Sequence, residues 1–301
     1  MTGAPVSNLR LVAAFAIVAL VWGSTWLVIK DQVSAVPATW TVSFRFALAS
    51  IAMAALALLR GESLRLPAPA LRLAALIGIA QFTCNFQLVY QAERYLTSGI
   101  VSVLYALLMV PNALAAWVFL RQPVSRRFLC GSTIAIGGIA LLLLHEYRLA
   151  PPEGSILLGV ALAFGGLAFA SVANVLQATP AAREVPLVPM LTWAMIFGAG
   201  ADVVLALAVD GAPAFDPRPQ YWAGLVYLAV IGSVLTFPLY FLLIRELGAG
   251  RAAYNGVVVP IIAMALSTLF EGYHWTWLAA AGTVIAMVGL LIALSGRQQR
   301  A

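Results

Sequence analysis

The sequence has few charged residues. Asp, Glu, Lys and Arg make up 9% of its 301 residues, whereas a soluble globular domain carries about 25%. Hydrophobic residues make up 63%. Because such a chain cannot present a charged surface to water on every side, we expect an all-α membrane protein rather than a soluble domain.

Residues typical of enzymes and metal sites are also scarce. There are two histidines, His145 and His274, with no HExxH pair, and two cysteines, Cys84 and Cys130, both in apolar segments. We therefore expect no metal, no cofactor and no disulfide framework. The chain has no GxxxxGK[ST] loop for ATP and no evident base for a serine nucleophile, so an intramembrane enzyme is the weaker alternative.

The net charge of +6 is scattered between apolar runs rather than gathered on one face. This pattern is typical of residues that flank membrane helices and argues against a nucleic-acid partner. The expected partners are the lipid bilayer and a small-molecule substrate, and the sequence leaves the oligomeric state open.

Apolar runs fill nearly the whole chain. Crossing a hydrocarbon core of about 30 Å takes about 20 helical residues. Ten runs are bounded by charge, Pro or Gly: 9–29, 38–59, 71–91, 96–119, 127–144, 155–177, 187–208, 221–243, 251–270 and 275–294. The first is interpreted as an uncleaved helix. Two junctions between runs are tight, so nine spans is the main alternative.

The distribution of basic residues predicts the orientation. Of the 17 Lys and Arg residues, 12 fall on the side of both termini and four on the other side, Lys30, Arg94, Arg148 and Arg218, while Arg45 lies inside a span. Since basic residues are enriched in cytoplasmic loops, we expect both termini in the cytoplasm of a bacterial-type inner membrane. Termini on one side require an even number of spans, which favours ten over nine.

Two motifs occur twice. Val110-Pro111 recurs as Val259-Pro260, 149 residues later, and the segment Gly131–Gly138 resembles Gly282–Gly289, 151 residues later. The paired glycines in each segment are seven residues apart and share a helix face, which predicts close helix packing in the membrane.

These matches predict a repeat of five helices, residues 1–148, followed by a second, residues 149–301. Because five is odd, the second repeat must be inverted in the membrane. Inverted repeats are typical of secondary transporters that work by alternating access.

The sequence resembles the drug/metabolite transporter superfamily in its EamA-type branch. The resemblance rests on Trp22-Gly23-Ser24-Thr25-Trp26 with Lys30, on Arg45-Phe46, on the mid-helix Pro111 and Pro260, and on the Gly-rich fifth and tenth spans. It extends over nearly the whole chain. It implies a transporter that exports small metabolites, most similar to bacterial exporters of aromatic and other amino acids.

One position departs from the family pattern. These repeats usually carry a glutamate at the end of the fourth helix of each half. Glu271 follows Leu269-Phe270 as the pattern implies, but the first half reads Leu120-Arg121-Gln122. Whatever the first glutamate does in other members of the family, Arg121 cannot do it in the same way.

Two charges inside the spans need an explanation, because ionised groups in hydrocarbon are costly. Arg45 lies on the second span and Asp202 on the seventh, the equivalent helix of the second repeat. They are interpreted as a charge network, with three alternatives. They pair or share hydrogen bonds, Arg45 attracts a substrate carboxylate, or each side chain extends to the interface.

The remaining acidic residues are expected at the periphery. Glu93, Glu146 and Asp216 are interpreted as solvated loop charges. Asp202 and Glu271 are then the only acidic candidates for proton coupling near the spans. Both are expected to be peripheral, which favours facilitated diffusion without excluding proton coupling.

The substrate site is expected beside the two proline-broken helices, because discontinuous helices at matching repeat positions commonly border the site. Amide groups on the third span and aromatic groups elsewhere are candidate lining residues. For the amides, hydrogen bonding between helices is the alternative role, and for the aromatic residues it is packing or interfacial anchoring. The candidates are Trp26, Gln81, Asn85, Tyr105, Asn112, Trp193, Tyr240, Tyr254 and Asn255.

These observations together predict a secondary transporter that exports amino acids, aromatic ones among them, or related small metabolites through a central cavity. A phosphate ester would need several converging Arg or Lys side chains, and only Arg45 is available. An exporter of another amphiphilic metabolite or drug, or a lipid flippase, is the alternative. The direction of transport rests on the resemblance alone.

Overall fold

The computed structural model describes residues 8–121, 123–149, 155–240, 242, 243, 246 and 254–295, and all regular elements in these ranges are helices. The expected all-α class is therefore confirmed for this part of the chain. Residues 251–253 of the ninth predicted span, and residue 241 of the eighth, lie outside the described residues.

The first half of the chain contains eight helical elements. In order they are α1 (Asn8–Ala35), α2 (Ala38–Leu59), α3 (Ala68–Gly78), η1 (Ile79–Asn85), α4 (Phe86–Ala92), α5 (Ser98–Ala106), α6 (Met109–Leu120) and α7 (Arg126–Leu149). Here η marks a π-helical segment.

The second half begins with α8. Its elements are α8 (Ile156–Ala178), α9 (Pro180–Arg183), α10 (Leu187–Val209), α11 (Pro219–Val226), η2 (Tyr227–Leu235), α13 (Asn255–Phe270) and α14 (Trp277–Ser295).

Nine helices within the described residues are long and apolar enough to cross a membrane, and each coincides with a predicted span. At the position of the remaining predicted span lies α13, an apolar helix of 16 residues. The total of ten spans stays a prediction.

The first helix is longer than its apolar run. The sequence predicts an end at residue 29, but α1 continues to Ala35 and includes Lys30. The charge does not end the helix because the Nζ atom of Lys30 donates hydrogen bonds to the backbone oxygens of Glu93 and Leu96. A lysine whose ammonium group is satisfied in this way can lie within a membrane helix.

Two spans change from α-helix to π-helix near their middle, where α3 continues into η1 and α11 into η2. In η2 the hydroxyl of Ser233 donates to the backbone oxygen of Leu228, five residues earlier, at 2.9 Å. π-helical segments are rare and frequently lie at functional sites. Both segments are therefore candidate positions for a functional site.

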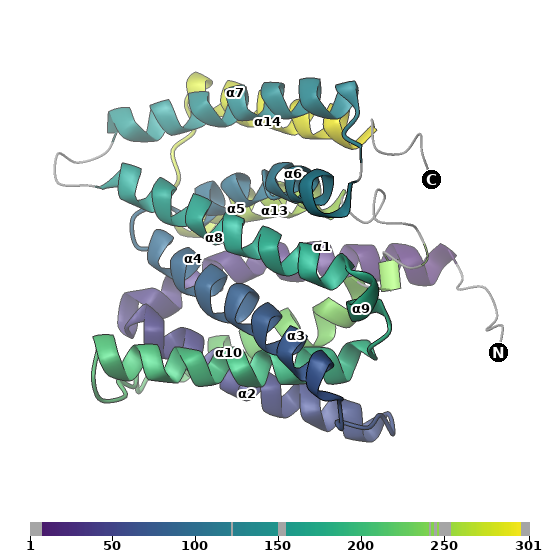
Figure 1. Cartoon of the computed structure of the whole chain (residues 1–301). Coiled ribbons are helices and arrows are strands. Elements are labelled where there is room, and N and C mark those ends of the chain that lie inside the picture. Colours follow the sequence, from purple (N-terminus) through teal and green to yellow (C-terminus); the bar gives the residue numbers. More distant parts are fainter. Residues whose placement is uncertain are drawn as a thin grey trace.

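The helices pack in layers (Figure 1). The pair α7 and α14 lies side by side at the top, α5 and α13 lie beneath them, and α2 and α10 pack together at the bottom. The two largest groups of buried apolar residues lie around the α2–α10 pair and around α5, α7, α13 and α14.

Glycine allows α7 and α14 to approach each other closely. A Cβ atom on Gly138 would lie 2.3 Å from the backbone nitrogen of Ala286, and one on Gly289 would lie 2.3 Å from the backbone nitrogen of Ala135. The predicted packing through small residues is confirmed. It matters here because apolar burial gives helices in lipid no driving force to associate.

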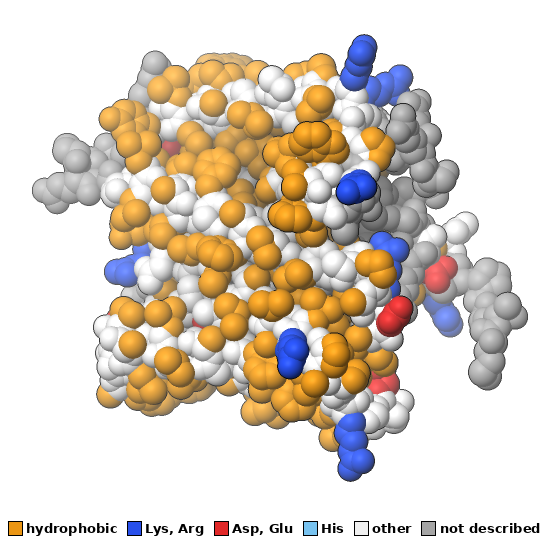
Figure 2. All heavy atoms as spheres, in the orientation of Figure 1, with side chains coloured by type: hydrophobic (Ala, Val, Ile, Leu, Met, Phe, Trp, Pro, Cys, Tyr) orange, Lys and Arg blue, Asp and Glu red, His pale blue; other side chains and the backbone are white. Residues whose placement is uncertain are grey.

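The surface is apolar over a broad face. Figure 2 shows hydrophobic side chains across the visible face, with most Lys and Arg side chains toward its edges. Exposed residues on two of the spans include Leu76 of α3 and Ile196 and Val204 of α10. An exposed apolar surface of this extent is typical of a protein surrounded by lipid.

Candidate functional site

Three predicted lining residues meet where α1, η1, α5 and α8 come together. The hydroxyl of Tyr105 donates to Oδ1 of Asn85 at 2.7 Å, and the rings of Tyr105 and Trp26 have centroids 5.1 Å apart. Gly166 of α8 makes room for this arrangement, because a Cβ atom there would lie 2.3 Å from the Tyr105 hydroxyl oxygen. We name Trp26, Asn85 and Tyr105 the Tyr105 cluster.

The Tyr105 cluster combines groups suited to an amphiphilic solute. Trp26 and Tyr105 are partly buried and present aromatic surface, while Asn85 is buried and provides an amide. The indole nitrogen of Trp26 is buried without a hydrogen-bond partner among the described residues. It is therefore a donor that a solute could satisfy.

A second aromatic group lies nearby on the same helix, one turn before Trp26. The ring of Trp22 lies 4.9 Å from that of Tyr240 and 5.8 Å from that of Phe237. The hydroxyl groups of Ser24 and Tyr227 form a hydrogen bond of 2.7 Å. These contacts join α1 to η2 and to the segment that follows it. Of the predicted aromatic candidates, Trp26 therefore belongs to the Tyr105 cluster, whereas Tyr240 contacts Trp22, one turn earlier on α1.

The other lining candidates are spread over different elements. Asn112 of α6 accepts a hydrogen bond from the side chain of Asn174 of α8 at 3.3 Å. Gln81 is half-buried in η1, whereas Asn255 is buried and Tyr254 is half-buried at the start of α13. Asn112 thus fits the alternative of hydrogen bonding between helices.

Trp193 lies apart from the Tyr105 cluster. Its indole nitrogen donates at 2.8 Å to the backbone oxygen of Leu64, in the loop between α2 and α3. This bond anchors α10 to a loop on the side of the bundle where α1 begins. Trp193 thus bonds to a loop and makes none of the contacts that define the Tyr105 cluster.

Arg45 is held by three side chains in the interior. It donates to the hydroxyl of Tyr90 at 2.9 Å and to that of Ser233 at 3.3 Å, and its guanidinium carbon lies 4.7 Å from the ring centre of Phe86. The residue is 3% exposed. These contacts and this burial contradict the alternative in which Arg45 extends to the interface. Nε of its guanidinium group is buried without a hydrogen-bond partner among the described residues.

Asp202 is fully buried and bonded elsewhere. Its Oδ1 accepts from the side-chain nitrogen of Gln87 at 2.9 Å. Among the described residues no ion pair joins Asp202 to Arg45. The structure therefore shows no direct pair between these two charged groups, although Nε of Arg45 and Oδ2 of Asp202 are both buried without a hydrogen-bond partner among the described residues. Gln87 and Tyr90, three residues apart on α4, lie between the two.

The sequence analysis did not single out a charged cluster that forms around Lys30. Glu93, expected to be a solvated loop charge, is 0% exposed, which corrects that expectation. The carboxylate of Glu271 accepts from the backbone nitrogen of Ser98 at 3.2 Å and from the Ser98 hydroxyl. We name the group Lys30, Glu93, Leu96, Ser98 and Glu271 the Lys30 closure, since it joins α1, the start of α5 and the end of α13.

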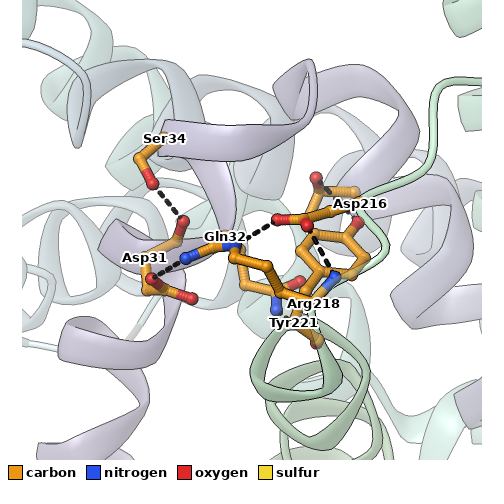
Figure 3. A network of polar contacts seen from close by, with 7 residues as sticks. Asp31, Gln32, Ser34, Asp216, Arg218 and Tyr221 are labelled. Atoms are coloured by element: carbon orange, nitrogen blue, oxygen red, sulfur yellow. Dashed lines mark hydrogen bonds and ion pairs between the residues drawn. The ribbon is translucent and has the colours of Figure 1, made fainter.

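A polar network lies at the same end of α1 (Figure 3). Arg218 forms ion pairs with Asp216 at 2.6 Å and with Asp31 at 3.4 Å, and Gln32 donates to the backbone oxygen of Tyr221 at 2.7 Å. Hydrogen bonding from the backbone nitrogen of Arg218 lowers the pKa of Asp216 below its ordinary value. Asp216 is 7% exposed, so it too is less solvated than expected.

Comparison with known proteins identifies relatives along the whole chain. The sequence profile of the EamA-like transporter family matches residues 9–144 and 157–295. The Salmonella typhimurium protein PagO is 24% identical over 94% of this chain and 92% of its own length. The Escherichia coli protein named uncharacterized inner membrane transporter YedA is 29% identical over 89% of this chain and 86% of its own.

Two further matches bear on function and fold. A Salmonella typhimurium protein named probable amino-acid metabolite efflux pump is 25% identical over 94% of both chains. One solved crystal structure matches 98% of this chain and 100% of its own, with a TM-score of 0.69 and 17% sequence identity. That structure shows the same fold.

Proposed function

Because the chain belongs to the EamA-like transporter family, we propose that it is a secondary transporter that exports amino acids, aromatic ones among them, or related small metabolites by alternating access. It is a multi-pass inner-membrane transporter, as the names of its relatives and the nine long apolar helices among its described residues indicate. Amino acids are proposed because one full-length relative is named as an amino-acid metabolite efflux pump.

Alternating access is supported by helix contacts that are symmetric between the halves. Helix α1 of the first half packs on η2 and α13 of the second half. Its counterpart α8, of the second half, packs on η1 and α6 of the first half. Likewise α2 packs on η2, and α10 packs on η1. Exchanging the two halves therefore reproduces these particular contacts, as the proposed inverted repeats require.

Local structure follows the same symmetry. The π-helical segments η1 and η2 lie at matching places in the third and eighth spans, and the family profile matches one stretch in each half. The beginning of α1 and the end of α14 lie toward the same side of the bundle (Figure 1). This arrangement supports the proposal that both termini share one side, which the charge distribution assigns to the cytoplasm.

The Tyr105 cluster is the single observation that carries the proposed substrate. It places two aromatic rings and a buried amide where helices of both halves meet. An aromatic or apolar amino-acid side chain would pack on Trp26 and Tyr105, while its amino and carboxyl groups need few, well-placed polar partners. The contacts of Arg45 assign it a structural role in this proposal.

Uptake into proteoliposomes tests the substrate class. Purified protein would be reconstituted, and transport of a labelled aromatic amino acid would be measured against a panel of unlabelled competitors. Competition by apolar and aromatic amino acids, but not by sugar phosphates, is expected. Saturable uptake of lipid analogues, with none of amino acids, would overturn the proposal in favour of a flippase.

A further inference from the structure

Glu93 has an environment that is unusual for a carboxyl group. It follows directly after α4, and its backbone nitrogen is bonded to the backbone oxygen of Val89 at 3.0 Å. The residue is 0% exposed, and neither carboxyl oxygen has a hydrogen-bond partner among the described residues. Burying an ionised carboxylate in this way is costly, whereas a protonated carboxyl group carries no net charge.

Lys30 does not neutralise Glu93 through a direct ion pair. Its Nζ atom donates instead to two backbone oxygens, that of Leu96 at 2.8 Å and that of Glu93 itself. The ammonium group thus caps the carboxyl end of α4 and ties the loop after it to α1. The side chain of Glu93, on the same loop, is fully buried.

Glu271 connects the same place to the second half of the chain. Its carboxylate bonds to the backbone nitrogen and the hydroxyl of Ser98, the first residue of α5. A negative charge at a helix amino terminus is favourable. The end of α13 is thereby held against the start of α5, and α1 packs on both helices.

The ionisable groups facing Glu93 come from three elements. They are Lys30 from α1, Glu271 from the end of α13 and Tyr90 from α4. The neighbouring α8 contributes an uncharged contact, with Gly159 against Leu96. Burial raises the pKa of Glu93 well above its ordinary value, Lys30 opposes this rise, and Glu271 adds to it.

We propose that Glu93 is a proton-binding site that controls the Lys30 closure. The protonated carboxyl group is compatible with the closed arrangement seen here. When the closure opens, the group meets water and releases its proton to solvent, leaving a hydrated carboxylate. Since the closed state binds the proton more tightly than the open state, acid favours closure and alkali favours opening. This inference rests on the proposed function in assigning the opening to a transport cycle.

Cysteine accessibility tests the site without any substrate. Cys84 and Cys130 would be replaced by serine, and Thr97, half-buried beside the closure, would be changed to cysteine. The rate of maleimide labelling in nanodiscs would be measured across pH and divided by that of an Arg94→Cys reference, which is exposed. This division removes the pH dependence that an exposed thiol has by itself. The relative rate is expected to increase with pH, by at most about tenfold per pH unit for one proton.

Substitutions at the closure separate a proton site from a purely structural contact. Glu93→Gln is expected to give a low rate that does not change with pH, whereas Glu93→Asp retains the pH dependence. Glu271→Gln should move the transition to lower pH, because it removes a negative charge that favours the protonated form of Glu93 and weakens the contact with Ser98 that holds the closure. Asp31→Asn, which changes an exposed carboxylate next to Lys30, should leave it in place.

The outcomes that overturn the inference are equally specific. A pH-dependent rise that persists in Glu93→Gln would assign the titration to another group. A transition that stays in place or moves to higher pH in Glu271→Gln would show that it does not report the Glu93 proton. Labelling needs no transported solute, so a failure of amino-acid transport would leave the labelling result intact. Equally, a failure of the labelling prediction would leave the proposed transport of amino acids untouched.

Discussion

The hydroxyl of Tyr105, on the fourth predicted span, donates a 2.7 Å hydrogen bond to Oδ1 of Asn85, the last residue of η1. The bond joins two irregular elements, a span that is interrupted near Pro111 and a π-helical segment. Gly166 of α8 touches the same hydroxyl group. We infer that these irregularities bring polar groups of separate helices to one position.

Removing the Tyr105 hydroxyl should weaken substrate recognition. Tyr105→Phe leaves Oδ1 of Asn85 buried without its donor, which costs about 1–3 kcal/mol. The part of this cost that falls on substrate recognition lowers the affinity about tenfold for each 1.4 kcal/mol. We expect a KM raised severalfold in proteoliposome uptake. Tyr147→Phe, which changes an exposed tyrosine, is the matched control. Equal KM values for Tyr105→Phe and the unchanged protein would contradict the proposed site.

Arg45 and Asp202 should contribute to stability separately. Because each has its own partners, the effects of Arg45→Gln and Asp202→Asn on the free energy of unfolding should add to within about 0.5 kcal/mol. Thermal unfolding of the two single variants and the double variant measures this coupling. If the double variant were as stable as the less stable of the two single variants, the two side chains would interact directly, which would contradict the structure.

The α7–α14 contact should tolerate no added atom. Gly138→Ala places a Cβ atom 2.3 Å from the backbone of Ala286, and overpacking of this kind costs about 1–3 kcal/mol. The adjacent Gly137→Ala is an internal control, because nothing lies within 4 Å of its Cβ position. A lower unfolding temperature is expected for the first variant alone. Equal unfolding temperatures would show that the two helices can move apart without loss.

Arg121 occupies a backbone conformation that suits glycine better. Its φ of 53° lies in the left-handed region at the end of α6, which costs a residue with a Cβ atom about 1–2 kcal/mol. Arg121→Gly should therefore unfold at a higher temperature than Arg121→Ala, which loses the same side chain but keeps the strain. Equal stability of the two variants would mean that the left-handed turn is absent in the folded protein.

The arrangement of spans could be predicted because it depends on local composition. Runs of apolar residues between charged and turn-forming residues gave nine helices that the structure contains, and glycines seven residues apart gave the α7–α14 contact. Lys30 was the informative exception. Its charge predicted a helix end, but the chain satisfies that charge with backbone oxygens that lie more than sixty residues away.

The site could be predicted only in part, because burial and pairing depend on distant segments. The sequence supplied Trp26, Asn85 and Tyr105 as candidates, but not that they meet, and it gave no sign of the π-helical turns. Glu93 follows an apolar span and precedes an arginine, which is typical of a solvated loop. Its burial results from contacts with α1 and α13, which no local pattern records.

Counterflow tests the central claim of a carrier with alternating access most directly. Proteoliposomes would be loaded with unlabelled aromatic amino acid and diluted into a trace of the labelled compound. A carrier should accumulate label transiently above its equilibrium level, because unlabelled solute leaving the vesicle drives exchange, and Tyr105→Ala should reduce this overshoot. Label that rises steadily to equilibrium without an overshoot, at the same rate in protein with and without the substitution, would contradict the account.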